Sequence, residues 1–464
     1  MSRDYLIEEF KKLAAFDCES YHESGIAAYL RGRLKELGLG VAIDGARERL
    51  LAEDPERRDT SSNIYGYLKG NTEGEARLFC AHMDTVSPGR GKYVLLTNDG
   101  RLISDGKTVL GADDVSGIVS ILYGLKEIGE KDLTHPDIEV LFTVAEEPYC
   151  SGSRFIDYSL LSAKTGYVFD LSGKAGRAAI SAPSIISLDI TVEGRAAHAG
   201  FSPEKGVNAL NAAAAALAQI RTGRLEDGLT LNFGTIRGGE GKNIVPEKVY
   251  IGGEIRSSVH ERALKEADRV RAIFENESQK LGAAADVRVT EHIRAYRLDT
   301  AGTAVSRFLR ATEAAEKKLH VGTAPSGDRC VDTFGGSDAN RLNANGIETA
   351  VIACGMENCH TTAEYAGIAD IELSAETALA LMTDPEQTED RWCKKMIQER
   401  EERWRSTELQ RTRPSGSSRH MTTYAPTRSV SDSTYPLRWS STETVTERVL
   451  TAYWSSRITC LSAG

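Results

Sequence analysis

Four short apolar runs constrain the fold of this chain more than any other feature. Each is rich in Val, Ile, Leu or Phe and ends in polar or glycine residues: ARLFCAHMD, IEVLFTVAEE, TGYVFDLSG and IETAVIACG. Runs of this kind are typical of strands buried on both faces of a sheet. A helical pattern, VSGIVSILYGLKEIGE, lies between the first two runs. Strands that alternate with helices indicate an α/β fold.

Residues 182–293 follow a different pattern. Period-two alternation occurs in SLDITVEG, LTLNFGTIRGG and KVYIGGEIRSS, and helical spacing occurs in NALNAAAAALAQI and ERALKEADRVRAIFENESQKL. The order of these elements fits a small α+β unit. The α/β pattern resumes after residue 300 and closes near Met382. We therefore predict one discontinuous domain, residues 1–181 and 294–384, with residues 182–293 inserted into it.

The composition changes from Pro385 onward. Residues 385–464 are rich in Ser and Thr, contain no Phe and include all four Trp of the chain. Such a segment has little apolar surface from which to build a core. We predict a mostly disordered appendage with one helix near residues 388–405.

Charge and hydropathy exclude several classes of partner. The net charge is −10, with 57 Lys and Arg against 67 Asp and Glu, which argues against nucleic-acid binding. No apolar stretch reaches the roughly 20 residues of a membrane span, and the charged start MSRDYLIEEFKK lacks the apolar region of a signal peptide. We expect a cytoplasmic protein with no membrane partner, and its eight cysteines, which form no CxxC pair, to be reduced thiols.

The first apolar run ends in His82-Met-Asp84, directly after RLFCA. Residues i and i+2 of a strand lie on the same face, so both side chains can point into one crevice. A carboxylate there could orient the second nitrogen of a metal-bound imidazole. Taken alone, the pair is a weak signal and is more typical of a surface histidine beside a turn aspartate.

Two pairs of adjacent carboxylates follow. Asp113 and Asp114 precede a helix that we expect to begin near Val115, where they could act as N-cap residues, or Asp113 could span two cations with its two oxygens. Glu146 and Glu147 end the second run. Because adjacent strand residues face opposite ways, one could bind metal while the other transfers protons.

Asp170 ends the TGYVFD part of the third run, and His360 follows the fourth run and the loop MENC. All these residues are expected at the carboxyl ends of strands or in the turns after them, where open α/β sheets place their ligand crevice. Two histidines and three carboxylates also suit two zinc-like ions that each retain an open position.

Seven ordered motifs resemble those of the M20 family of dinuclear zinc peptidases, and most of all its peptidase T-like branch. They are HMDTVSPGRG, SDGKTVLGADDVSG, LFTVAEEPYCSGS, AAHAGFSPEKGVNA, KNIVPEKVYIGGEIRSS, GGSDANRLNANGI and CHTTAEY. The resemblance covers about residues 1–382. It implies a zinc-exopeptidase-like mixed sheet flanked by helices, with the inserted α+β unit as a lid domain.

The resemblance also implies two Zn²⁺ ions per chain, with Co²⁺ or Mn²⁺ as substitutes. His82, Asp113 and Asp170 would bind one ion. Asp113, Glu147 and His360 would bind the other, so that Asp113 bridges the pair.

The same resemblance assigns the neighbouring residues. A cis peptide is expected between Asp113 and Asp114, and Asp84 would orient His82. Glu146 would be the general base, taking a proton from the zinc-bridging water and passing one to the leaving amine.

Further residues match family positions that contact substrate. In the lid these are His198, Asn243 and Arg256, of which the histidine often acts from a partner subunit. Arg256 could pair with a substrate carboxylate, or it could be an exposed strand arginine. The GGSDAN turn offers three more polar side chains for a peptide backbone or amino terminus: Ser337, Asp338 and Asn340.

The resemblance implies an exopeptidase that releases the amino-terminal residue of short peptides, most of all tripeptides. An N-acyl amino acid amidohydrolase or desuccinylase with the same metal pair is the alternative, and a non-catalytic peptide-binding protein is a third. The lid could also pair two chains into a homodimer. Val115 replaces the usual lysine, and DRCVDTF precedes GGSDAN in place of small residues, which leaves the fine substrate preference open.

Overall fold

The computed structural model describes residues 2–322 and 329–383. The tail predicted for residues 385–464, with its helix near 388–405, lies outside the described residues.

The main sheet contains nine strands within the described residues, in the order β1-β2-β6-β3-β7-β16-β8-β14, with β15 paired to β8. The strands are β1 Gly40–Ile43, β2 Ile64–Leu68, β3 Arg77–His82, β6 Ile138–Thr143, β7 Thr165–Leu171, β8 Ala178–Ala182, β14 Tyr296–Arg297, β15 Cys330–Asp332 and β16 Glu348–Ala353. β3 runs parallel to β6 and β7, and β16 runs parallel to β7. Antiparallel pairs flank this centre, such as β2 with β6 and β16 with β8. The predicted mixed sheet is confirmed.

Both faces of the main sheet are covered, which explains why its central strands are apolar throughout. In β3, Phe79 and Ala81 face one core and Leu78 and Cys80 face another. The first core is covered by α1 Ser2–Ala14, α2 Ser24–Glu36, α3 Ala46–Glu53, α4 Ala112–Lys131, α7 Thr303–Leu319 and α9 Ile368–Thr383. The second is covered by α8 Ala339–Ala344 and by the segment with the short 3₁₀ turns η1 Gly152–Phe155 and η2 Tyr158–Leu160.

A small sheet of very short strands was not predicted. It consists of β4 Leu95–Leu96, β5 Arg101–Ile103, β17 Met356–Glu357 and β18 Tyr365–Gly367, in the order β17-β18-β5-β4. The loop between β17 and β18 contains His360. The sheet therefore anchors both ends of that loop.

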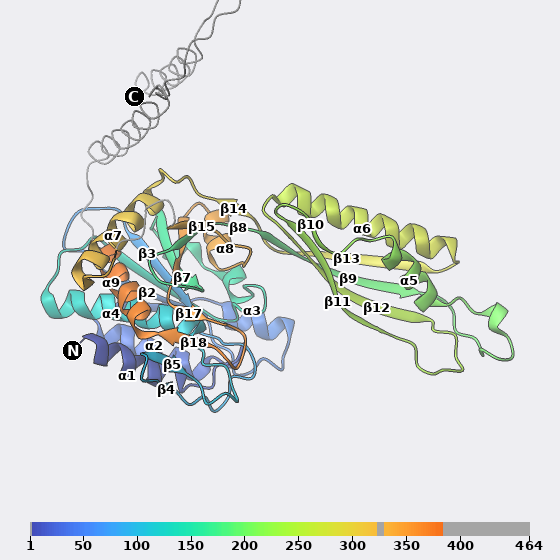
Figure 1. Ribbon diagram of the computed structural model, residues 1–464, viewed down its shortest axis with the longest axis horizontal. Coiled ribbons are helices and arrows are strands. Elements are labelled where there is room, and N and C mark those ends of the chain that lie inside the picture. The colour runs from blue at the N-terminus through green and yellow to red at the C-terminus, as the bar shows by residue number, and fades with distance from the viewer. Residues whose placement is uncertain (1, 323–328, 384–464) are drawn as a thin grey trace, which may run out of the picture. The chain divides into compact units, whose positions relative to one another are not determined.

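The inserted unit, Ser184–Ile293, has its own antiparallel sheet of five strands, all described, in the order β10-β11-β12-β9-β13 (Figure 1). Its elements are β9 Ser184–Glu193, η3 Pro203–Lys205, α5 Ala209–Ala218, β10 Gly223–Glu226, β11 Leu229–Gly238, β12 Lys248–Ser257, α6 His260–Lys280 and β13 Ala284–Ile293. Helix α6 buries residues at helical spacing, among them Ala263, Ala267, Val270 and Phe274, in a core separate from those of the main sheet. The predicted α+β unit is confirmed, with the short strand β10 as an unpredicted addition.

None of the helices in residues 2–322 and 329–383 is both long and apolar enough to cross a lipid bilayer.

Candidate active site

The predicted metal ligands come together because four adjacent parallel strands end at one edge of the main sheet. In the order β6-β3-β7-β16, these strands lead to Glu147, His82, Asp170 and His360, respectively. Asp113 reaches the same place from the first turn of α4. The crevice therefore lies where open α/β sheets place it.

Asp113 contacts two different imidazoles with its two oxygens. Oδ1 lies 3.0 Å from Nε2 of His82, and Oδ2 lies 3.3 Å from Nε2 of His360. Glu147 Oε2 is 2.9 Å from His360 Nε2, and Asp170 Oδ1 is 3.6 Å from His82 Nε2. We call these five residues the candidate metal cluster: His82, Asp113, Glu147, Asp170 and His360.

The donor set of this cluster fits divalent cations. Imidazole nitrogens and carboxylate oxygens are ligands for zinc and similar ions, and His82, Asp113 and Glu147 have ligand atoms within 4.8 Å of one another. Glu147 Oε1 is buried and has no hydrogen-bond partner in the described part of the chain. A buried carboxylate oxygen without a partner is costly, and a bound cation would provide that partner.

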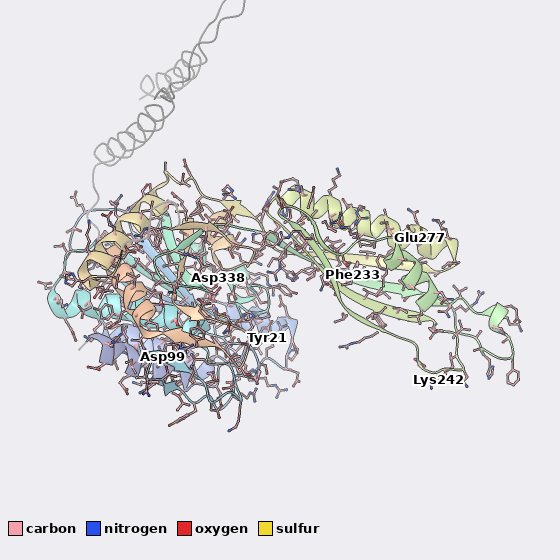
Figure 2. All side chains as sticks on the ribbon, viewed as in Figure 1. Tyr21, Asp99, Phe233, Lys242, Glu277 and Asp338 are labelled. Atoms are coloured by element: carbon pink, nitrogen blue, oxygen red, sulfur yellow. The ribbon has the colours of Figure 1, made fainter. Side chains whose placement is uncertain are left out.

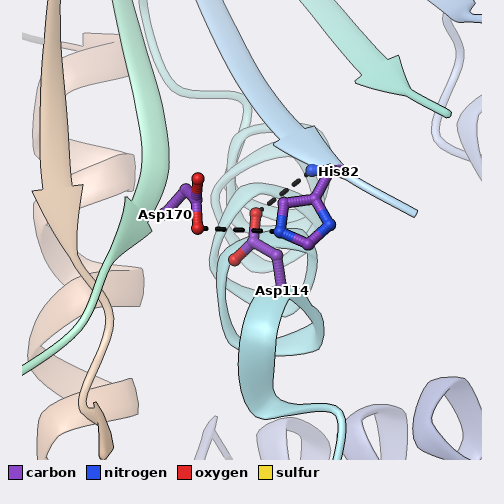
Figure 3. Close-up of side chains that lie close together, drawn as sticks. All are labelled: His82, Asp114 and Asp170. Atoms are coloured by element: carbon purple, nitrogen blue, oxygen red, sulfur yellow. Dashed lines mark hydrogen bonds and ion pairs between the residues drawn. The ribbon is translucent and has the colours of Figure 1, made fainter. Parts of the chain in front are cut away.

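Asp114 is adjacent to this cluster but interacts mainly with the backbone. Its Oδ2 accepts the backbone N–H of His82 at 3.2 Å, and its Oδ1 accepts that of Gly117 at 3.1 Å. Figure 3 shows the Asp114 carboxylate linked to the His82 backbone nitrogen and the Asp170 carboxylate linked to the His82 ring. The predicted cis peptide between Asp113 and Asp114 is present, and both residues have non-helical backbone angles although they lie inside α4.

His82 is oriented by Asp84, although not only through the side chain that the sequence suggested. The ring Nδ1 lies 3.0 Å from the backbone oxygen of Asp84 and 3.6 Å from its carboxylate Oδ1. A proton on Nδ1 directed at these oxygens leaves Nε2 as the ligand nitrogen that faces Asp113.

The expectation that Glu146 and Glu147 are strand residues is wrong. β6 ends at Thr143, and Ala145 has a left-handed backbone angle, φ 47°, which is uncommon for a residue other than glycine. The turn is fixed because side chains accept four successive backbone N–H groups. The pairs are Val144 to Asn63 (3.1 Å), Ala145 to Glu23 (3.1 Å), Glu146 to Asp84 (2.9 Å) and Glu147 to Asp84 (3.2 Å).

Glu364 supports Asp113 in a similar way. It is 2% exposed, and it accepts the N–H of Gly111 at 2.8 Å and that of Asp113 at 3.0 Å. Sequence reasoning gave no role to Glu23 or Glu364. The only signal for Glu364 was its place in the CHTTAEY motif, and Glu23 had none.

The electrostatics of the cluster reflect its concentration of buried carboxylates. Burial and the charge of Asp170 raise the pKa of Glu146 well above its usual range. Burial and the charge of Asp113 raise the pKa of Glu147 to about 7, and burial raises the pKa of Asp170 to about 7. Hydrogen bonds with Asp113 and Glu147 raise the pKa of His360 to about 10. Bound cations would compensate this negative charge.

A pocket of about 270 Å³ opens at the cluster. Its lining includes Asp113, Glu146, Glu147, Asp170, His360 and, from strand β12 of the inserted unit, Arg256. The Arg256 guanidinium contacts Glu254 Oε1 at 2.6 Å and donates to the backbone oxygen of Phe334 at 3.0 Å.

The GGSDAN residues lie beside this pocket. Gly335 and Gly336 line it, whereas Ser337, Asp338 and Asn340 are buried. The Asn340 amide donates to the backbone oxygens of Pro183 at 3.0 Å and Arg294 at 2.8 Å. It thereby ties together the two connections to the inserted unit. Figure 2 labels Asp338, whose Oδ2 accepts a hydrogen bond from Thr143 at 2.5 Å.

His198 and Asn243 are exposed on loops of the inserted unit and are not among the residues that line the pocket. The backbone of Ala199 donates to that of Asn243 at 2.9 Å, so the two loops lie side by side. Figure 2 labels Lys242, the neighbour of Asn243, in the loop between β11 and β12. The structure thus groups these two residues with each other and not with the cluster.

Comparisons with known proteins identify relatives of this chain. Residues 180–281 match the peptidase dimerisation domain, and residues 63–214 match peptidase family M28. An uncharacterized protein from Bacillus subtilis, YqjE, is 31% identical over 82% of this chain and 98% of its own length. A Listeria innocua peptidase T is 24% identical over 81% of this chain and 97% of its length.

Two solved structures are similar over nearly their whole length. A tripeptidase from Staphylococcus aureus is 30% identical with a TM-score of 0.74, and the aminopeptidase PepT from Bacillus cereus is 31% identical with a TM-score of 0.71. Each match covers 82% of this chain and 98% of the other. With this identity and coverage, the chain belongs to the M20/M28 family of peptidases.

Proposed function

We propose that this chain is an exopeptidase that uses two divalent metal ions, Zn²⁺ or its substitutes Co²⁺ and Mn²⁺, to release the amino-terminal residue of short peptides such as tripeptides. The observation that carries the proposal is the position of Asp113, whose two oxygens face the Nε2 atoms of His82 and His360 at 3.0 and 3.3 Å. Similarity to a tripeptidase and to PepT supports the choice of substrate.

In this proposal Asp113 bridges two sites. His82 and Asp170 complete one, and Glu147 and His360 complete the other. When bound there, a pair of divalent ions lowers the pKa of water towards neutrality and polarises the scissile carbonyl.

Glu146 is the proposed general base. It lines the pocket and is 8% exposed, and the hydrogen bond that its backbone N–H donates to Asp84 fixes the turn in which it lies. Its carboxylate takes a proton from the attacking water and delivers one to the leaving amine.

The pocket supports a short substrate. Its volume of about 270 Å³ lies just below the range of about 300–1,000 Å³ that is typical of ligand pockets. Arg256 on its wall can form a bidentate pair with the substrate's terminal carboxylate. Because Ile185, Arg256 and Ile293 of the inserted unit all line the pocket, we propose that residues 182–293 act as its lid.

The match to a peptidase dimerisation domain supports a homodimer through the inserted unit. In such a dimer His198 and Asn243 would contact substrate in the partner's pocket. This arrangement would give a role to two residues that lie outside the pocket of their own chain.

Metal analysis combined with a substrate panel tests the proposal. Full-length protein should bind two ions and cleave tripeptides, lose activity on chelation and regain it with Zn²⁺ or Co²⁺. Glu146→Gln should retain both ions and lose about 10²–10⁴-fold in kcat. Cleavage of N-acyl amino acids but not of tripeptides would favour the amidohydrolase, and peptide binding without cleavage would favour the binding protein. A Glu146→Gln protein with the parental rate would show that another group is the base.

A further inference from the structure

Glu146, Cys150 and Asp338 form a second group of ligand atoms beside the candidate metal cluster. One ligand atom of each lies within 4.8 Å of the other two. The three residues are 8%, 2% and 1% exposed, respectively. We propose that they form a third cation site that binds thiophilic divalent ions such as Cd²⁺, or Zn²⁺ in excess, and that its occupation inhibits the enzyme.

The turn after β6 places the thiol against the carboxylate. The backbone N–H of Ser151 bonds to the oxygen of Ala145 at 2.8 Å, and Tyr149 and Cys150 have left-handed backbone angles, φ 61° and 52°. The chain thus folds back so that Cys150 Sγ donates to Glu146 Oε1 at 3.2 Å. Gly152 keeps the turn closed, since a Cβ there would lie 2.0 Å from the backbone oxygen of Val144.

An unpartnered oxygen is the second observation that points to a ligand. Asp338 Oδ2 accepts a hydrogen bond from Thr143, but its Oδ1 is buried and has no hydrogen-bond partner within residues 2–322 and 329–383. A buried carboxylate oxygen in that state costs free energy. A cation between Asp338, Glu146 and Cys150 would remove that cost.

The donor atoms determine which ions bind. One sulfur and two carboxylate oxygens suit zinc-like and softer ions, whereas magnesium and calcium prefer all-oxygen sites. The ion displaces the thiol proton, so that an S–metal bond forms, the S–H bond breaks and the proton passes to solvent. Cys150 and Glu146 both line the pocket, which provides the route of entry.

Inhibition follows from the identity of one ligand. An ion bound to Glu146 occupies the carboxylate that is proposed to transfer protons. This consequence rests on the proposed function, whereas cation binding itself does not.

The test uses full-length protein loaded with two equivalents of Zn²⁺ and titrated with Cd²⁺. One further equivalent should bind and produce the ultraviolet charge-transfer band of a cadmium thiolate, while tripeptide hydrolysis falls. Cys150→Ser should bind one equivalent fewer and give no band. Each rate is compared with the cadmium-free rate of the same protein, and Cys150→Ser should need at least about tenfold more Cd²⁺ for the same fractional inhibition.

Cys359→Ser is the matched control, because Cys359 is another thiol in the lining of the same pocket. It should keep the band and the inhibition. Asp338→Asn retains the thiol and should weaken cadmium binding, which provides a second test if Cys150→Ser does not fold. A wild-type protein with no band, or a band that disappears with Cys359 and not with Cys150, would overturn the proposal. The band and the stoichiometry decide the site even if the protein cleaves no peptide.

Discussion

Oδ1 of Asp84 accepts the backbone N–H of Glu146 at 2.9 Å. Its Oδ2 accepts the N–H of Glu147 at 3.2 Å, so one carboxylate fixes both the proposed base and a proposed ligand. Asp84→Asn replaces one of the two acceptor oxygens by an amide nitrogen. This nitrogen is a hydrogen-bond donor, so it cannot accept the N–H group that it faces. We expect metal affinity to fall about 10–100-fold, with a parallel loss of kcat, as measured by chelator competition and tripeptide hydrolysis.

Asp137 is the matched control for this substitution, since its Oδ1 accepts the backbone N–H of Gly70 at 2.7 Å outside the pocket. Asp137→Asn should leave metal affinity unchanged. Equal losses in the two variants would mean that the effect of Asp84→Asn reflects general stability.

Glu364 should control metal binding through Asp113, whose backbone N–H it accepts at 3.0 Å. Glu364→Gln retains one acceptor oxygen and Glu364→Ala retains none, so affinity should decrease from wild type to Gln to Ala, by about 10–100-fold for Ala. Isothermal titration of the metal-free proteins measures the series. Glu376→Ala removes a buried carboxylate that instead bonds Tyr123 and Lys318, and it should not follow this trend. Identical affinities in all four proteins would contradict the role of Glu364.

Arg256→Ala should raise KM for tripeptides with a free carboxyl terminus by roughly 10–100-fold, the equivalent of about 1.5–3 kcal/mol for a charged hydrogen bond. Peptides with an amidated terminus lack the partner of Arg256 and should show little change. Steady-state kinetics on both substrates gives the comparison. Arg237→Ala, on an exposed position of β11, is the control, and equal effects on free and amidated peptides would show that Arg256 does not bind the carboxylate.

Mixing two inactive proteins tests the role of the partner subunit. If His198 acts in the pocket of the partner, a dimer of one His198→Ala chain and one Glu146→Gln chain has one intact site. The mixture should therefore hydrolyse more tripeptide than the two proteins measured separately. A mixture of Glu146→Gln with Glu364→Ala should show no recovery, because both changes affect the site within each chain. If the first mixture shows no recovery of activity, His198 does not contribute to catalysis in the pocket of the partner subunit.

Glu23 should make stability depend on pH. Burial and the charge of Asp84 raise its pKa from 4.5 to about 8, so between these values the folded protein binds a proton that the unfolded chain has released. The contribution of Glu23 to the free energy of unfolding is fully present below pH 4.5. It decreases as the pH rises to about 8, by at most about 1.4 kcal/mol per pH unit.

Glu23→Gln cannot ionise and should lack this decrease. Urea unfolding of both proteins at pH 5 and pH 8 measures the difference. Parallel pH dependences in the two proteins would show that Glu23 is ionised in the fold.

The main sheet and the meeting of the predicted ligands could be predicted because both depend on local signals. Buried strands are apolar along their whole length, and the ends of parallel strands meet at one edge. The turn at Glu146 could not be predicted, because Val144 and Ala145 continue the apolar run while their N–H groups bond to Asn63 and Glu23.

Glu23 lies 122 residues before Ala145, and no periodicity links positions so far apart. The small sheet escaped prediction for another reason, since strands of two or three residues are too short to show a pattern. The metal roles of the cluster and the contacts of His198 and Asn243 stay predictions.

The strand order has a consequence for biosynthesis. β3 lies between β6 and β7, which follow it in the chain, and His360 comes after all three. A growing polypeptide can therefore complete its ligand set only when translation has passed the last imidazole. Of the two proposed sites, the one that includes His360 therefore cannot form before β16 has joined the sheet, so its metal binding is coupled to that late step of folding.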